Sequence, residues 1–389
     1  MSTTTAALPP SITSRPSAAP AAGKYLFGPI PDFLLLGGAT FLLLPLILLL
    51  GGRLQHAEVL VWTTLAAHAI NNPHFAHSYH LFYRGFSQKG FSAEYPKEWR
   101  VRYLVAGVFA PVLLMGFFVW CLVYGKTQLL GYGVNLMFFT VGWHYTKQGY
   151  GMLMLDAVLK RRFFTDPEKK LLLHNAYAVW LLSWMIANQV FAQSDYWGIA
   201  YFTFEIPRVA RLAAWALVAF TSLRVLWLFV ARLRAGRGLP VNGLVGYAVS
   251  GYLWLLYPEP IMALIIPALH SLQYMIVVWR YELNYQTVRV HRDEGGGEDE
   301  PPDAAPFSLG LRMMMFYGVA VGLGYFGFWY FPRTLGDWLP DTLRAFGGGV
   351  FLFCAWVFIN VHHYFMDSVV WRNTLSSRGL PSAVGSLAV

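Results

Sequence analysis

Long apolar segments separated by short polar connections make up most of the chain. A transmembrane helix needs about 20 mainly apolar residues, and most of these segments are about that long. We therefore predict an all-α fold, a polytopic bundle of transmembrane helices. The predicted bundle has about ten spans, at residues 32–51, 58–83, 103–124, 128–155, 171–192, 209–231, 241–257, 259–281, 311–331 and 345–370.

The remaining segments have the composition of tails and loops. Residues 1–25 are rich in Ser, Thr, Ala and Pro and lack an apolar signal-peptide core, so we expect a disordered cytoplasmic tail. Residues 26–375 are expected to form a single transmembrane domain, followed by a short C-terminal tail at 376–389. Within the domain, 193–208 is expected to be an interfacial re-entrant loop, and 284–308, which contains GGGEDEPPD, a flexible loop.

Basic residues alternate between the predicted connections. The connections after spans two, four, six and eight each hold several basic residues. The connection after span one holds only Arg53, that after span three only Lys126, and that after span seven no basic residue. Because loops rich in Lys and Arg stay in the cytoplasm, this alternation places both termini there. We expect a multi-pass integral protein of the bacterial inner (plasma) membrane, in direct contact with the lipid bilayer.

The composition excludes an ordinary soluble protein, since 56% of the residues are hydrophobic and only 13% are charged. In a soluble domain, the net charge of +9 would indicate a nucleic-acid partner. Here the basic residues lie mainly in short loops, so they set the membrane topology, and we expect no nucleic-acid partner. Cys121 and Cys354 lie inside apolar segments and predict no disulfide.

One eleven-residue pattern occurs three times, each time near the end of an apolar segment. It begins with histidine and ends with an aromatic residue followed by arginine, in HFAHSYHLFYR (74–84), HSLQYMIVVWR (270–280) and HHYFMDSVVWR (362–372). Ten helical residues rise about 15 Å, half of a hydrocarbon core about 30 Å thick. If each aromatic–Arg pair marks a membrane interface, then His74, His270 and His362 lie near the bilayer midplane, at one depth in three helices.

Further ionisable side chains accompany these histidines. His77 lies three positions after His74 and shares its helical face. His144 lies in a fourth predicted span, followed by Lys147 and Gln148. His363 follows His362 directly, and Asp367 lies four residues beyond His363 on the same face. Adjacent helical residues point about 100° apart, so we expect one of the two to ligate and the other to pack or to serve a second centre.

Ionisable residues within a membrane usually mark functional sites. The candidate metal ligands are His74, His77, His144, His270, His362, His363 and Asp367, with Asp367 either a ligand or an orienting hydrogen-bond partner. Tyr145, Tyr274 and Tyr364 are the candidate catalytic residues, which would assist by hydrogen bonding. The alternative for the same residues is polar packing, for instance of the second span with Asn71 and Asn72.

Several neutral imidazoles with one carboxylate suit iron, zinc or copper, whereas magnesium and calcium prefer oxygen ligands. A histidine-rich site deep in lipid favours non-haem iron, one or two ions, that uses O₂ on a hydrophobic small-molecule substrate. Zinc-dependent hydrolysis is less favoured because HExxH is absent, and GxSxG is also absent.

Histidines spread over several membrane helices resemble those of two groups of membrane-bound non-haem iron enzymes. These are the lipid desaturase/hydroxylase group and the Brp/Blh-type carotene dioxygenases. HxxH at His74/His77 and His77/His80 and HH at His362/His363 are similar to the desaturase boxes, although HxxxH and HxxHH are themselves absent. The likeness to the carotene dioxygenases is one of layout, with ligands on separate helices. Both resemblances imply an iron oxidoreductase acting on a lipid or isoprenoid, with an electron-donor protein as a possible partner.

Two other functions fit the same pattern. Histidine pairs on facing helices could hold haem b as axial ligands in an electron carrier, with clearance at Gly347, Gly348 and Gly349. A transporter could use histidines with Lys147 and Asp367 as an ion or proton path. An inverted repeat would be expected of many transporters, yet the three copies of the pattern all point the same way.

Overall fold

The computed structural model describes residues 24–50, 57–259, 262–293, 306–338, 346 and 349–371. Most of these residues are helical, and three π-helical turns (η1, η3 and η4) interrupt the α-helices. The elements of the first half are α1 (Pro29–Phe33), η1 (Leu34–Gly38), α2 (Ala39–Leu50), α3 (Ala57–Tyr83), α4 (Phe86–Phe91), α5 (Lys97–Leu104), η3 (Val105–Phe109), α6 (Ala110–Val123), α7 (Thr127–Leu159) and α8 (Asp166–Val190). The second half contains β1 (Asp195–Tyr196), β2 (Ile199–Ala200), α9 (Arg208–Arg234), α10 (Val241–Leu256), α11 (Met262–Asp293), α12 (Pro306–Tyr325), η4 (Phe326–Tyr330), α13 (Phe331–Trp338) and α15 (Val350–Val370).

The prediction of a mainly helical fold is confirmed, and most of each of the ten predicted ranges is helical. Within the described ranges, four helices are long and apolar enough to cross a membrane: Lys97–Val123, Arg208–Arg234, Ser308–Trp338 and Val350–Val370. Pro29–Leu42 and Val241–Leu256 are shorter apolar helices. Helices of this length and apolar composition are typical of a membrane protein.

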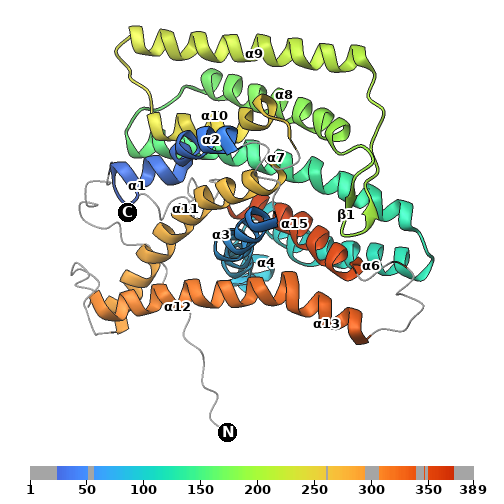
Figure 1. The fold of residues 1–389 in the computed structure, drawn as a ribbon. Coiled ribbons are helices and arrows are strands. Elements are labelled where there is room, and N and C mark those ends of the chain that lie inside the picture. Colours follow the sequence, from blue (N-terminus) through green and yellow to red (C-terminus); the bar gives the residue numbers. More distant parts are fainter. Residues whose placement is uncertain are drawn as a thin grey trace.

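The outermost helices expose apolar side chains. Leu223 and Trp227 on α9 are 66% and 70% exposed, and Met314 on α12 is 66% exposed. Such surfaces are rare on soluble monomers but are suited to contact with lipid. Figure 1 shows α9 along one side of the molecule and α12 with α13 along the opposite side, and α3, α11 and α15 lie between them.

Two connections differ from the sequence-based expectation. Of the predicted flexible loop 284–308, residues 284–293 belong to α11 and 306–308 to α12, and 294–305 lie outside the described residues. The extra turns of α11 are supported by Gln286 Nε2, which donates to Glu282 Oε1 at 2.7 Å, and by Thr287 Oγ1, which donates to Leu283 O at 2.8 Å. Segment 193–208 contains an antiparallel two-strand hairpin, in which Asp195 pairs with Ala200 and Tyr196 with Ile199. Of the predicted tails 1–25 and 376–389, residues 1–23 and 376–389 lie outside the described residues.

Small residues let the central helices approach one another closely. A Cβ atom at Gly149 of α7 would lie 2.7 Å from Ser250 Cβ of α10. Likewise, a Cβ at Gly324 of α12 would lie 2.7 Å from Asn72 Cβ of α3. Glycine at these two positions therefore sets how closely α10 supports α7 and α12 supports α3.

Candidate metal centre

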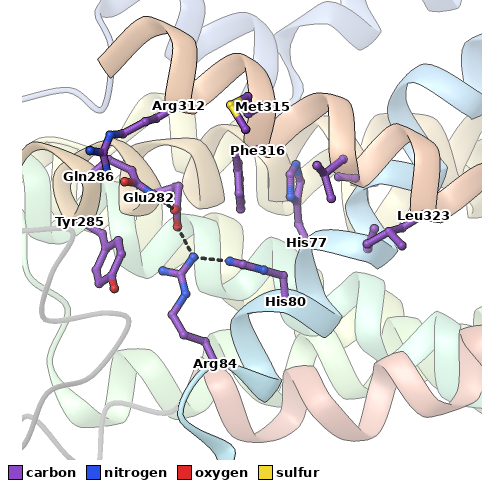
Figure 2. Close-up of a pocket in the computed structure, with 13 residues that line it drawn as sticks. His77, His80, Arg84, Glu282, Tyr285, Gln286, Arg312, Met315, Phe316 and Leu323 are labelled. Carbon is purple, nitrogen blue, oxygen red and sulfur yellow. Dashed lines mark hydrogen bonds and ion pairs between the residues drawn. The ribbon is translucent and has the colours of Figure 1, made fainter. Parts of the chain in front are cut away.

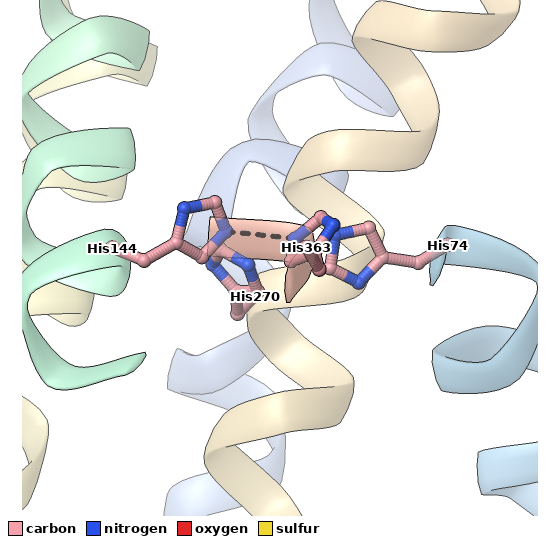
Figure 3. A group of neighbouring side chains, drawn as sticks. All are labelled: His74, His144, His270 and His363. Atoms are coloured by element: carbon pink, nitrogen blue, oxygen red, sulfur yellow. Dashed lines mark hydrogen bonds between the residues drawn. The ribbon is translucent and has the colours of Figure 1, made fainter. Parts of the chain in front are cut away.

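Four histidines from four different helices meet in the interior. They are His74 of α3, His144 of α7, His270 of α11 and His363 of α15, and one ligand nitrogen from each lies within 4.8 Å of the others. Figure 3 shows the four side chains converging on a common centre from separate helices. We call this group the four-histidine cluster.

Each imidazole ring of the cluster lies against two of the others. The ring centroid of His363 lies 4.6 Å from that of His74 and 4.7 Å from that of His144. His270 lies 4.7 Å from His144 and 5.1 Å from His74. All four side chains are buried, and His144, the most exposed, is only 8% accessible.

Several nitrogen atoms of the cluster have no protein partner. His74 Nε2, both ring nitrogens of His270 and His363 Nδ1 are buried without a hydrogen bond within the described part of the chain. Buried polar atoms are nearly always paired, so several unpaired imidazole nitrogens within one cluster of histidines fit a metal ion. Neutral imidazole nitrogen is also the most common protein ligand of transition metals.

The closest nitrogen pair has a spacing that suits two ligands of one ion. His363 Nε2 and His144 Nε2 lie 3.1 Å apart, within hydrogen-bond distance. Two nitrogens bonded at about 2.0–2.1 Å to one metal, at 90–109° to each other, lie roughly 2.9–3.4 Å apart. The spacing of this pair therefore fits two imidazole ligands of a single ion.

A serine from the neighbouring helix orients His74. Ser271 Oγ lies 3.0 Å from His74 Nδ1, 2.8 Å from Asn71 Oδ1 and 2.7 Å from Pro267 O. A hydroxyl has a single hydrogen, and two of these partners only accept, so Oγ donates to one of them and accepts from Nδ1–H. The lone pair of His74 is then on Nε2, the nitrogen without a partner in the described structure.

Asp367 lies beside the cluster on α15. Its Oδ2 atom is 3.7 Å from His144 Nε2 and 3.6 Å from His363 Nε2, and the side chain is buried. The side chains of Ser78, Tyr274 and Trp371 lie close to the carboxyl group. The carboxylate is therefore close enough to influence both imidazoles.

His77 and His362, two of the predicted ligands, lie outside the cluster. The His77 ring stacks on Phe316 of α12, with centroids 4.1 Å apart. His362 has partners at both nitrogens, because Tyr79 OH lies 2.8 Å from Nδ1 and Ala106 O lies 2.9 Å from Nε2. Of the adjacent pair, His363 faces the cluster and His362 joins α15 to α3 and η3.

Two of the three candidate tyrosines adjoin the cluster. The Tyr145 ring lies 4.1 Å from that of His270, and the Tyr274 ring lies 4.4 Å from that of His74. The Tyr274 hydroxyl accepts a hydrogen bond of 2.6 Å from Ser78 Oγ. Tyr364 instead packs against Phe365, and within the described residues it makes no ring contact with a cluster histidine.

Sequence reasoning did not single out Ser271, although it shapes the site most directly among the non-histidine residues. The sequence does hold a signal for Ser271, because it is a polar residue directly after His270, at the depth of the cluster. Gln148 is a second supporting residue, since its Nε2 donates to His270 O at 2.9 Å and so fixes the α11 backbone beside the ligand.

Comparisons of this chain with models of known protein families, with curated proteins and with solved structures found no match.

Proposed function

We propose that the chain is a membrane-embedded, metal-dependent oxidoreductase: a non-haem iron oxygenase or desaturase acting on a lipid or isoprenoid-like substrate. The observation that carries the proposal is the four-histidine cluster, in which ligand nitrogens from four helices lie within 4.8 Å of one another. A buried all-imidazole site with a nearby carboxylate suits iron, which when bound would activate O₂.

The side chains around the cluster would have distinct roles. His74, His144, His270 and His363 would hold the ion, and Ser271 would keep the lone pair of His74 directed to it. Asp367, 3.6 Å from His363 Nε2, would orient the imidazoles or take up a proton. Tyr145 and Tyr274, whose rings touch His270 and His74, would hydrogen-bond polar atoms of a bound substrate.

The crowding of the cluster disfavours the haem alternative. A porphyrin needs a broad, flat space between two facing imidazoles, whereas here four rings lie with neighbouring centroids 4.6–5.1 Å apart. The transporter alternative would treat the same histidines as an ion path. Four imidazoles gathered in one buried cluster are better suited to holding one ion than to passing ions along.

The membrane arrangement belongs to the same proposal. The helices at the ten predicted ranges would all span the bilayer of a bacterial inner membrane, with both termini in the cytoplasm. Substrate would enter sideways from the bilayer, and an electron-donor protein would dock on the cytoplasmic loops.

Metal analysis of the purified protein tests this function. We expect iron near one ion per chain and no Soret band in the visible spectrum. The iron-loaded protein, in oleoyl phosphatidylglycerol liposomes that contain β-carotene, should convert lipid or carotene with O₂ and ascorbate, as seen by mass spectrometry. A Soret band, or a chain that binds no transition metal, would overturn the proposal.

Two adjacent histidines provide a matched pair of variants. His363→Ala should lower the iron content at least tenfold, because it removes a ligand of the cluster. His362→Ala should keep the iron, because His362 instead bonds Tyr79 and Ala106. Equal iron loss in both variants, with both folded by circular dichroism, would contradict the assignment of the ligands.

A further inference from the structure

A second polar site lies apart from the four-histidine cluster. A cavity of about 450 Å³ lies between α3, α11 and α12, and it is lined by residues from Ala76 to Arg84, Glu282 to Gln286 and Arg312 to Leu323. No histidine of the cluster lines it. We call it the Arg84 cavity.

One end of the Arg84 cavity is charged. Arg84 Nη2 donates to Glu282 Oε2 at 2.8 Å, and the Arg84 guanidinium lies 4.4 Å from the centre of the Tyr285 ring. Glu282 is fully buried, and its other oxygen accepts from Gln286 Nε2 at 2.7 Å. Arg312 also lines this end, so two arginines lie near one carboxylate. Two guanidinium groups and one carboxylate therefore line the charged end.

Polar atoms at the cavity wall still lack partners. Arg84 Nη1, His77 Nε2 and Gln286 Oε1 are buried without a hydrogen bond within the described residues, and all three residues line the cavity. His77 itself is 1% exposed. Arg84 Nη1 is a cationic donor, and such a donor is suited to a ligand with anionic oxygen atoms.

The opposite end is apolar and faces outward. Met315, Val319 and Leu323 of α12 line the cavity and remain 58–60% exposed. Figure 2 shows Arg84, Glu282, Gln286 and Arg312 gathered at one end and Leu323 at the other. The cavity thus changes from charged to apolar along α12.

The direction of this change matches the depth of a membrane. Arg312 lies near the start of the candidate span Ser308–Trp338, and Leu323 lies at its middle. The eleven residue steps from Arg312 to Leu323 rise about 16 Å, which is roughly half of the hydrocarbon core. A molecule that fills the cavity would have its polar group at the interface and its chain in the lipid.

We propose that the Arg84 cavity binds an anionic amphiphile. Its carboxylate or phosphate lies against Arg84 and Arg312, and its apolar chain follows Met315, Val319 and Leu323. Charged hydrogen bonds from arginine hold the head group, and burial of the chain adds the hydrophobic contribution. Binding does not depend on the metal chemistry proposed above.

Displacement of cis-parinaric acid, a fluorescent fatty acid, from the full-length protein in neutral detergent tests this site. Oleate and oleoyl lysophosphatidate should compete at least tenfold better than oleyl alcohol, which has the same chain as oleate without its charge. The better of the two anions identifies the head group. Equal competition by the alcohol would overturn the proposal, as would displacement by inorganic phosphate alone.

Two variants link binding to the cavity. Arg312→Gln should weaken oleate binding about five- to tenfold, whereas Arg333→Gln, which removes an arginine from the other end of the same candidate span, should not. Val319→Trp should block the apolar end and abolish probe binding. Wild-type affinity in both Arg312→Gln and Val319→Trp would overturn the proposal.

A third variant separates this proposal from the proposed function. His144→Ala/His363→Ala, which disables the four-histidine cluster, should still bind the probe. Retained binding with lost iron would support two separate sites, and retained iron in this variant would count against the metal centre alone. Loss of probe binding in the folded variant would overturn the independence of the cavity.

Discussion

His74 depends on a hydroxyl group from another helix for its orientation. Ser271 accepts from Nδ1 of His74 while it is itself held by Asn71 and Pro267. Outer groups of this kind determine which nitrogen of a histidine can bind a metal. Ser271 is therefore a positioning residue rather than a ligand.

Substitution of this serine should weaken metal binding without loss of the fold. Ser271→Ala should lower iron affinity about 10- to 100-fold, measured by competition with a chelator of known affinity. Ser78→Ala is the matched control, since Ser78 is also buried but bonds the His74 backbone and Tyr274 instead of an imidazole. If the two variants lose affinity equally, Ser271 has only a packing role.

At the scale of the helices, α10 holds α7 in the position that the cluster needs. The two helices touch where Gly149 meets Ser250, five residues after His144. Ser250 Oγ also donates to Gln273 Oε1 of α11 at 3.0 Å, so the contact extends to the helix that carries His270. Close packing here therefore fixes two of the four ligand helices.

A pair of glycine variants tests this contact. Gly149→Ala should destabilise the protein by about 1–3 kcal/mol, because its Cβ would overpack against Ser250. Gly151→Ala, on the same helix, should be neutral or slightly stabilising, because its Cβ meets nothing within 4 Å and alanine favours helix. The melting temperatures in detergent compare them, and a stable Gly149→Ala variant would contradict the close contact.

Across the whole molecule, apolar side chains lie on the outside and polar side chains lie in the interior, which is the reverse of a soluble protein. The outer helices α9 and α12 expose large apolar side chains, whereas the four-histidine cluster and Asp367 are buried in the centre. This arrangement suits a bilayer, in which buried polar groups are stable only when other helices surround them.

The proposed orientation predicts which loops are accessible from outside. In a Cys121→Ala/Cys354→Ala background, Lys126→Cys should react with a membrane-impermeant maleimide in intact spheroplasts. Lys169→Cys should react only after permeabilisation, because its connection is rich in basic residues. Both positions are exposed in the structure, so accessibility reports topology, and the reverse pattern would contradict it.

The sequence predicted the helical ranges well because length and hydropathy are local properties. It missed the extension of α11 to Asp293, since polar helical turns beyond an apolar segment have the composition of a loop. Hydrogen bonds within those turns, such as Gln286 to Glu282, become evident only with coordinates.

By itself, the sequence determined that the chain is helical and which helices carry histidines in their interiors. Only the tertiary structure decided that His363 rather than His362 meets His74, His144 and His270, and that His77 turns instead to Phe316. Spacing along a helix sets the depth of a side chain, whereas the rotation of each helix about its axis is set by packing against its neighbours. Adjacent residues about 100° apart can therefore have entirely different surroundings.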